Sequence, residues 1–396
     1  MKINFVLRTL VFITLACSLL TNAGELTVSQ EKQSFNGGWR FAKGELSGAE
    51  QANFNDKKWR QLNLPHDWAI EGPFSKKYSA RNGGLPVFGT AWYRKHFTLP
   101  IGSNNKVVSV RFDGVMANSQ VYVNGHLAGE RPFGYIGFQY DISQYLKPAG
   151  ETNIISVKVA PENYAARWYS GSGIYRNTWI EINDSAHFKE WETQISTPLV
   201  SDKTATIAIN SVIQNTQSKK NLSLKITIVN DENTEIVSKT QNLESTKAND
   251  ITVSEQLKLN NPRRWDTTDP YRYKVITQLS QDGQVIDTET HPLGIRSIEF
   301  KVDDGFWLNG RRVEIQGVCL HHDNGPLGAV ANMRAIERKL EIMQAMGVNS
   351  VRTAHNPPSP ELVELADKMG ILLQLEAFDT WKKAKHTVVN GYHKHY

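Results

Sequence analysis

Apolar and polar positions alternate with a period of two through the first half of the chain. Runs such as VVSVRFDGV, NIISVKVA and YRNTWIEI recur from Gly24 to about Asp184 and are interrupted by turn residues. In QVYVNGHLAG, two such runs flank Asn124-Gly125, and both residues of this pair tolerate the positive φ of a tight hairpin turn. The pattern predicts an antiparallel β-sandwich over residues 24–184.

Tryptophan is concentrated in this first segment. Six of the ten tryptophans of the chain fall here, namely Trp39, Trp59, Trp68, Trp92, Trp168 and Trp179. Such a cluster forms either a hydrophobic core or a platform for sugar rings, and the large area that each ring buries favours the core.

Residues 185–294 keep the two-residue period but change in composition, because Lys, Asn, Thr, Ser and Gln become more frequent. The runs TATIAINSVIQN, LSLKITIVN and YRYKVITQLS predict a second, smaller β-sandwich of about one hundred residues, the size of an immunoglobulin-like domain. Residues typical of catalysis do not gather in it.

The period changes after Gly294. In ANMRAIERKLEIMQAMG, the spacing of Ile336, Leu340 and Met343 is that of an amphipathic helix. Ser359-Pro360 mark the N-cap and first turn of a second helix. The helices alternate with strands in VEIQGVCL, VNSVR and ILLQLE, and this order predicts parallel pairing and the first three βα units of a (β/α)₈ barrel. The predicted fold class is therefore multidomain β plus α/β, with the partial barrel over residues 295–396.

Polar and aromatic residues follow each of these three strands. His321-His322-Asp323 follow the first, His355-Asn356 end a short turn after the second, and Glu376 to Trp381 follow the third. Because the loops after barrel strands all face the same mouth, we expect these side chains to converge there. Cys319, inside the apolar first strand, is expected to pack rather than react.

Other interpretations of these residues remain open. Adjacent histidines on an extended segment point to opposite faces, so His321 and His322 do not suit one metal ion, and no metal or other cofactor is predicted. Glu376 and Asp379 suit either a catalytic pair or the holding of hydroxyls and neighbouring loops. Each single histidine also fits a simple turn residue.

Charge and the amino terminus bear on partners and location. The net charge is +5, or +3 without Lys2 and Arg8, and acids and bases are interspersed, so nucleic-acid binding is not expected. Residues 1–23 have the basic start, short apolar run and small-residue end of a secretory signal, too short to span a membrane. We expect export to the periplasm or the exterior of a bacterium; a lipoprotein anchor at Cys17 is disfavoured by Thr14.

Long segments of the chain resemble a known family. GVCLHHDNGPLG, MGVNSVRTAHNPPSPELVELADKMGI and EAFDTWK are similar to the signature of glycoside hydrolase family 2, found in bacterial β-galactosidases and their β-glucuronidase relatives. FNGGWRF, LPHDWAI, FDGVMANSQVYVNGHLAG and RWYSGSGIYRNTWIEI resemble the jelly-roll sugar-binding domain of that family. The resemblance implies a jelly-roll domain, an immunoglobulin-like sandwich and a TIM barrel. It also implies hydrolysis of terminal β-linked sugars with retention, by two catalytic glutamates.

The resemblance carries over to individual positions in this chain. It implies that His321 and His355 contact the sugar, that Asn356, Asp379 and Trp381 line the pocket, and that a jelly-roll loop reaches the site with Arg167 and Trp168. Glu376 matches the motif of the third strand, which implies a residue that organises the loop beside the substrate.

The chain departs from the family pattern at its end. Residues 295–396 supply about one hundred of the roughly 250 residues that a barrel needs, and no Asn-Glu pair occurs. We therefore expect a truncated chain whose catalytic glutamates lie beyond Tyr396, and which is inactive and prone to aggregate alone. Trp381-Lys382-Lys383 and NGYHK are more similar to the β-galactosidase branch of the family, and this resemblance implies β-galactosides as substrates. The alternatives are β-glucuronides, whose carboxylate suits the lysines, and a non-catalytic carbohydrate-binding fragment; the oligomeric state of a full-length enzyme stays open.

Overall fold

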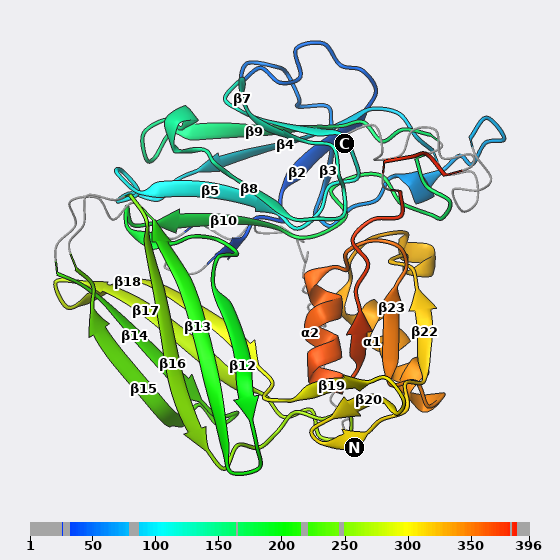
Figure 1. The fold of residues 1–396 in the computed structure, drawn as a ribbon. Coiled ribbons are helices and arrows are strands. Elements are labelled where there is room, and N and C mark those ends of the chain that lie inside the picture. Colours follow the sequence, from blue (N-terminus) through cyan, green and yellow to red (C-terminus); the bar gives the residue numbers. More distant parts are fainter. Residues whose placement is uncertain are drawn as a thin grey trace, which may run out of the picture.

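The computed structural model describes Leu26 and residues 32–78, 87–163, 165–214, 221–244, 249–380 and 382–385. The predicted signal segment, residues 1–23, and the predicted pocket residue Trp381 lie outside the described residues. Figure 1 shows three parts: two stacked sheets at the top, a second sandwich at the lower left, and a small αβ unit at the lower right.

The first part, called the jelly-roll below, is a sandwich of two sheets. The six-stranded sheet has the order β3-β2-β4-β9-β6-β7, and the four-stranded sheet has the order β1-β10-β5-β8. Side chains of both sheets, among them Tyr93, Val157 and Ile180, form one core. The strands are β1 (Gln33–Ser34), β2 (Trp39–Lys43), β3 (Arg60–Leu62), β4 (Ala91–Thr98), β5 (Val107–Phe112), β6 (Ser119–Val123), β7 (His126–Arg131), β8 (Phe138–Asp141), β9 (Thr152–Val159) and β10 (Thr178–Asn183). The short helical turns η1 (Ala69–Glu71) and η3 (Ser143–Tyr145) lie between them.

Two details of the first part confirm the sequence analysis. Asn124 and Gly125 connect β6 to β7 with φ of 50° and 92°, which is the hairpin that the Asn-Gly pair predicts. Trp39, Trp68 and Trp92 are buried, as a core interpretation requires. The core interpretation holds only for part of the cluster, because Trp59, Trp168 and Trp179 remain half-buried.

The second part is also a sandwich, as the alternation predicts. One sheet joins β11 and β12 to β13, which also pairs with β16, and the other has the order β15-β14-β17-β18. Burial alternates residue by residue along all of β13, so one face enters the core and the other meets solvent. The strands are β11 (His187–Phe188), β12 (Gln194–Val200), β13 (Thr204–Gln214), β14 (Leu222–Val229), β15 (Glu235–Asn242), β16 (Ile251–Asn260), β17 (Tyr273–Gln281) and β18 (Gln284–Leu293).

The third part, called the barrel segment below, begins with a small antiparallel sheet. Its strands are β19 (Ile298–Lys301), β20 (Gly305–Leu308) and β21 (Arg311–Arg312). Three parallel strands follow, β22 (Gly317–Leu320), β23 (Ser350–Thr353) and β24 (Leu372–Gln374), with β23 in the middle. The turn η4 (Gly325–Leu327) and the helix α1 (Met333–Ala345) lie between β22 and β23, and α2 (Pro360–Met369) precedes β24. The predicted strand–helix alternation and parallel pairing are confirmed.

The second helix begins and ends where its sequence predicts. The Ser359 side chain accepts a hydrogen bond from the Leu362 backbone N–H, and Pro360 occupies the first turn. Gly370 ends the helix in the left-handed conformation, with φ of 77°. Leu362, Leu365 and Ala366 pack with residues of α1 and the parallel strands.

The expectation for Cys319 was wrong, because its side chain is exposed. Both helices cover the same face of the parallel sheet, where Val318, Val351 and Leu373 pack against them. Side chains alternate along a strand, so Cys319 and its cross-strand neighbours Arg352 and Gln374 point to the other face. A parallel strand is ordinarily buried on both faces, but no described segment covers this second face.

Candidate functional site

Arg176, two residues before β10, fixes the loop that follows β23. Its guanidinium donates to the backbone carbonyls of Pro357 at 3.0 Å, Pro358 at 3.1 Å and Tyr135 at 2.8 Å. Arg176 is 1% exposed. The Pro-Pro pair therefore does more than stiffen the loop: it turns two carbonyls toward the jelly-roll and so positions His355.

Asp67 makes a second connection between the jelly-roll and the barrel segment. Its Oδ1 accepts hydrogen bonds from the backbone N–H groups of Ala69 and Ser172, both at 2.9 Å. Its Oδ2 accepts from the Tyr169 hydroxyl at 2.6 Å and from the Ala329 N–H at 2.8 Å. Burial raises the pKa of Asp67, and these four donors oppose that rise by favouring the carboxylate.

Two glycines permit this close packing around Asp67. Gly171 and Gly328 have φ of 75° and 61°, in the region that favours glycine. A Cβ on Gly328 would lie 2.4 Å from Asp67 Oδ2, and one on Gly171 would lie 2.8 Å from the same atom. Gly171 and Gly328 thus allow the loop that carries Arg167 and Trp168 to approach the barrel segment closely.

Three rings from different segments meet at the mouth of the parallel strands. The centroids of His321, after β22, and His355, after β23, lie 5.7 Å apart with an interplanar angle of 83°. The Trp168 ring, from the jelly-roll, lies 5.5 Å from each of them. The structure therefore brings together three of the residues that the sequence singled out.

Glu376 orients His355. Its Oε2 lies 2.8 Å from His355 Nδ1, and its other carboxylate oxygen pairs with Arg352. Because a carboxylate only accepts, we assign the ring proton to Nδ1, which leaves Nε2 for a ligand. The Glu376 N–H donates to the Thr353 hydroxyl at 3.1 Å, which ties the third loop to β23.

Asp379, in the loop after β24, joins this loop to the jelly-roll loop that carries Arg167. It accepts hydrogen bonds from the Arg167 guanidinium and from Lys385 Nζ at 2.6 Å. Burial raises the pKa of Asp379, but the hydrogen bonds and charges of Lys385 and Arg167 outweigh this effect, so the pKa lies below its ordinary value. Glu376 and Asp379 therefore serve separate ion pairs.

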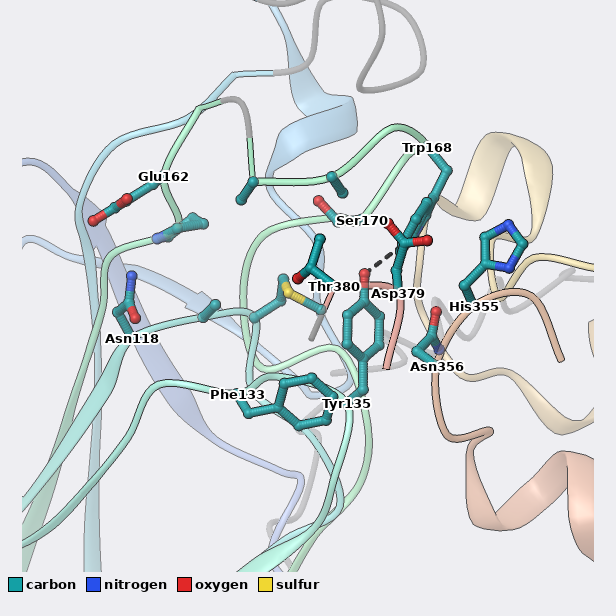
Figure 2. A pocket seen from close by; sticks show the side chains of 15 residues that line it. Asn118, Phe133, Tyr135, Glu162, Trp168, Ser170, His355, Asn356, Asp379 and Thr380 are labelled. Carbon is teal, nitrogen blue, oxygen red and sulfur yellow. Dashed lines mark hydrogen bonds between the residues drawn. The ribbon is translucent and has the colours of Figure 1, made fainter. Parts of the chain in front are cut away.

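Trp168, His355 and Asp379 border a pocket with about 630 Å³ of empty space, including open solvent (Figure 2), whereas Arg167, His321 and Glu376 are not among its lining residues. The jelly-roll supplies most of its lining, including Met116, Phe133 and Tyr135, which the sequence analysis missed. The dashed line in Figure 2 marks the bond from Trp168 Nε1 to the Tyr135 hydroxyl, at 3.1 Å. The available signal was the segment RPFGYIG, in which aromatic residues stand next to glycines.

Asn356 lines the same pocket but is 4% exposed. Its amide Nδ2 donates to the Pro357 carbonyl at 3.1 Å, so the donor side serves the loop. Its Oδ1 is buried and has no hydrogen-bond partner among the described residues. Asn356 can therefore offer this oxygen to an incoming group as an acceptor.

His322 faces away from the ring cluster, as the alternation of an extended segment predicts. Its Nε2 lies 3.1 Å from the Ser170 carbonyl, and its ring packs edge-on against Tyr135 and Tyr175. Within the described part of the chain, no three His, Cys, Asp or Glu side chains are grouped to hold a metal ion.

His322 should make stability depend on pH. Burial lowers the pKa of His322 to about 4, whereas an unfolded histidine titrates at about 6.5. Its contribution is therefore complete above about pH 6.5 and is lost progressively as the pH falls toward about 4, a loss of about 3 kcal/mol. Unfolding midpoints measured between these pH values should fall less steeply for His322→Phe than for the unchanged chain. His126→Phe, at an exposed histidine, is the control, and equal slopes for the unchanged chain and His322→Phe would contradict the assignment.

A jelly-roll packed on parallel βα units, with histidine and tryptophan rings at their shared mouth, agrees with the domain architecture that the resemblance to glycoside hydrolases implies. Three family models match successive parts of the chain: the sugar binding domain of glycosyl hydrolases family 2 at residues 32–189, glycosyl hydrolases family 2 at 186–296, and the TIM barrel domain of that family at 299–394. The chain belongs to glycosyl hydrolase family 2.

Curated proteins and solved structures agree with this assignment. The chain is 40% identical to a β-galactosidase from Bacteroides ovatus, over 93% of this chain and 43% of that protein. It is 34% identical to a putative β-glucuronidase from Formosa agariphila, over 88% and 33%. A crystal structure of a family 2 member from Bacteroides cellulosilyticus matches with a TM-score of 0.88 and 38% identity, over 92% of this chain and 48% of that one. The chain thus spans less than half the length of these relatives.

Proposed function

We propose that this chain is the substrate-binding amino-terminal part of an exo-acting, retaining β-glycosidase that prefers terminal β-galactosides. The observation that carries the proposal is the meeting of His321, His355 and Trp168 at the strand mouth. The similarity to a β-galactosidase along 93% of the chain supports the choice of sugar.

The geometry suits the binding of one sugar ring. The Trp168 indole offers a flat apolar surface to the C–H groups of a pyranose. The imidazoles of His321 and His355 and the acceptor oxygen of Asn356 offer polar contacts to hydroxyl groups. Because Trp168 is anchored through Tyr135 and His355 through Glu376, the site is largely formed before the ligand arrives, and little ordering entropy is lost on binding.

The catalytic carboxyls are assigned to the part of the enzyme outside these 396 residues. Retention requires two carboxyl groups about 5–5.5 Å apart, one as nucleophile and one as acid/base. Glu376 is engaged by His355 and Arg352, and Asp379 by Arg167 and Lys385. Both carboxylates therefore position other groups.

The purified 396-residue chain is expected to show no turnover of 4-nitrophenyl β-galactoside. It contains no Asn-Glu pair, and the uncovered face of its parallel sheet should also promote aggregation. Release of nitrophenol, followed by its absorbance, is the measurement. Turnover that disappears in His355→Ala would refute the assignment of the catalytic groups.

Ligand binding tests the proposal without turnover. Methyl β-galactoside should perturb tryptophan fluorescence of the chain, and His355→Ala should weaken this binding by about tenfold or more. Lys301→Ala, on β19 outside the pocket, is the control. Tighter binding of methyl β-glucuronide would favour the second candidate function, that of a β-glucuronidase. This candidate is supported by the basic groups of Arg167 and Lys385 and by the similarity to proteins named as β-glucuronidases.

We also propose that the protein is exported, on the basis of the signal-like residues 1–23. Among the helices that the structure describes, none is long and apolar enough to cross a membrane.

A further inference from the structure

A larger cleft lies between the jelly-roll and the second sandwich. It contains about 1490 Å³ of empty space, including open solvent. Residues of β10 line one side of it and residues of β18 the other. None of the residues that line it also lines the candidate pocket. The cleft is therefore a separate feature that the proposed function does not use.

Two indole rings border this cleft. Trp191 is 54% exposed, and the Arg111 guanidinium lies 5.2 Å from the centroid of its ring. Trp179 donates through Nε1 to Asp113 Oδ2 at 2.7 Å, and Lys32 Nζ lies 4.7 Å from its ring centroid. Polar contacts thus fix both rings, and large aromatic side chains held at a cleft are typical binding anchors.

A buried carboxyl group without a strong partner, that of Glu181, also lines the cleft. Glu181 is 8% exposed, and its one hydrogen bond in the described residues comes from Gln139 at 3.4 Å. Glu190 pairs with Arg111, and Glu289 accepts from Thr193 at 2.6 Å, so these neighbours are already engaged. Buried polar groups are ordinarily satisfied, so Glu181 has capacity for a ligand.

The chemistry of the cleft favours a neutral ligand over a metal ion. Burial raises the pKa of Glu181 to about 7, and the nearby Glu190 charge acts in the same direction. A carboxyl group that is partly protonated near neutral pH both donates and accepts hydrogen bonds, as sugar hydroxyls do. The described carboxylates do not group as a metal site.

We propose that this cleft is a second carbohydrate-binding site, which takes a neutral oligosaccharide chain against Trp191 and Trp179 and bonds its hydroxyls through Glu181. Such a site would hold the protein on a polymer while the candidate pocket binds a chain end. It does not depend on which sugar the candidate pocket prefers.

Native gel electrophoresis of the 396-residue chain in gels containing β-1,4-galactan, galactomannan or hydroxyethylcellulose tests the proposal. At least one polysaccharide should retard the chain. Trp191→Ala and Glu181→Leu, which removes both the donor and the acceptor, should each lower the association constant for that polysaccharide by about tenfold. Trp307→Ala, at a partly exposed tryptophan on β20, is the matched control and should leave retardation unchanged; circular dichroism verifies that each variant is folded.

Three results would overturn the proposal. One is the absence of retardation by all three polysaccharides, and another is retardation that Trp191→Ala leaves intact. The third is retardation that only Trp168→Ala removes, which would place binding in the candidate pocket. Calcium binding that Glu181→Gln abolishes, in a chain that no polysaccharide retards, would assign the cleft to a cation instead.

Discussion

Replacing Arg176 with methionine is expected to destabilise the chain by about 3 kcal/mol or more. The guanidinium satisfies the buried carbonyls of Tyr135, Pro357 and Pro358, and each buried polar group left without a partner costs about 1–3 kcal/mol. Methionine keeps much of the apolar stem, so the effect reports the lost hydrogen bonds. Chemical denaturation followed by near-ultraviolet circular dichroism measures it.

The control for this experiment is Arg263→Met, which removes an exposed ion pair with Asp269. Exposed pairs contribute little, so this variant should unfold close to the unchanged chain. Limited proteolysis adds a local measurement, because the Arg176 variant should become sensitive to cleavage near Pro357. Equal stability of the two arginine variants would show that the jelly-roll does not hold this loop.

Replacing Asp67 with alanine is expected to affect both stability and ligand binding. Four buried donors would lose their acceptor, and two of them, on Tyr169 and Ser172, belong to the loop that presents Trp168. We expect a loss of about 3 kcal/mol or more in unfolding free energy and at least about a tenfold loss in affinity for methyl β-galactoside. Calorimetry and fluorescence titration are the two measurements.

The variant Asp67→Asn keeps the shape of the side chain but removes one of its two acceptor oxygens. The amide oxygen retains the acceptor role of Oδ1 toward Ala69 and Ser172, whereas its NH₂ group faces donors in place of Oδ2. This isosteric variant should therefore lie between the unchanged chain and Asp67→Ala. An Asn variant as impaired as the Ala variant would contradict the division of the four bonds between the two oxygens.

The sequence predicts the elements of this fold better than the contacts between its domains. Strict alternation in β13 and the Ser-Pro and glycine boundaries of α2 are local signals, and the structure confirms them. The exposure of Cys319 could not be predicted from local sequence, because it depends on whether other elements cover the second face of the parallel sheet. The apolar sequence of the strand is the same whether that face is covered or open.

The residues of the candidate site could likewise be predicted from the sequence only in part. His321 and His355 could be predicted because both follow barrel strands, whose ends share one mouth. Met116, Tyr135 and Asp67 were missed because they lie in jelly-roll loops, where no periodicity marks their direction. Their roles depend on how one domain packs against another, which spacing along the chain does not encode.

The uncovered face of the parallel sheet gives Cys319 a practical use. Its thiol is the one cysteine outside the first 23 residues, and it is exposed beside Arg352, whose Nη1 lies 3.3 Å from the sulfur. A maleimide dye should therefore label this single atom quickly in the present chain and slowly wherever additional strands close over the sheet. Labelling rate would report assembly of the barrel directly, with no sugar and no catalysis required.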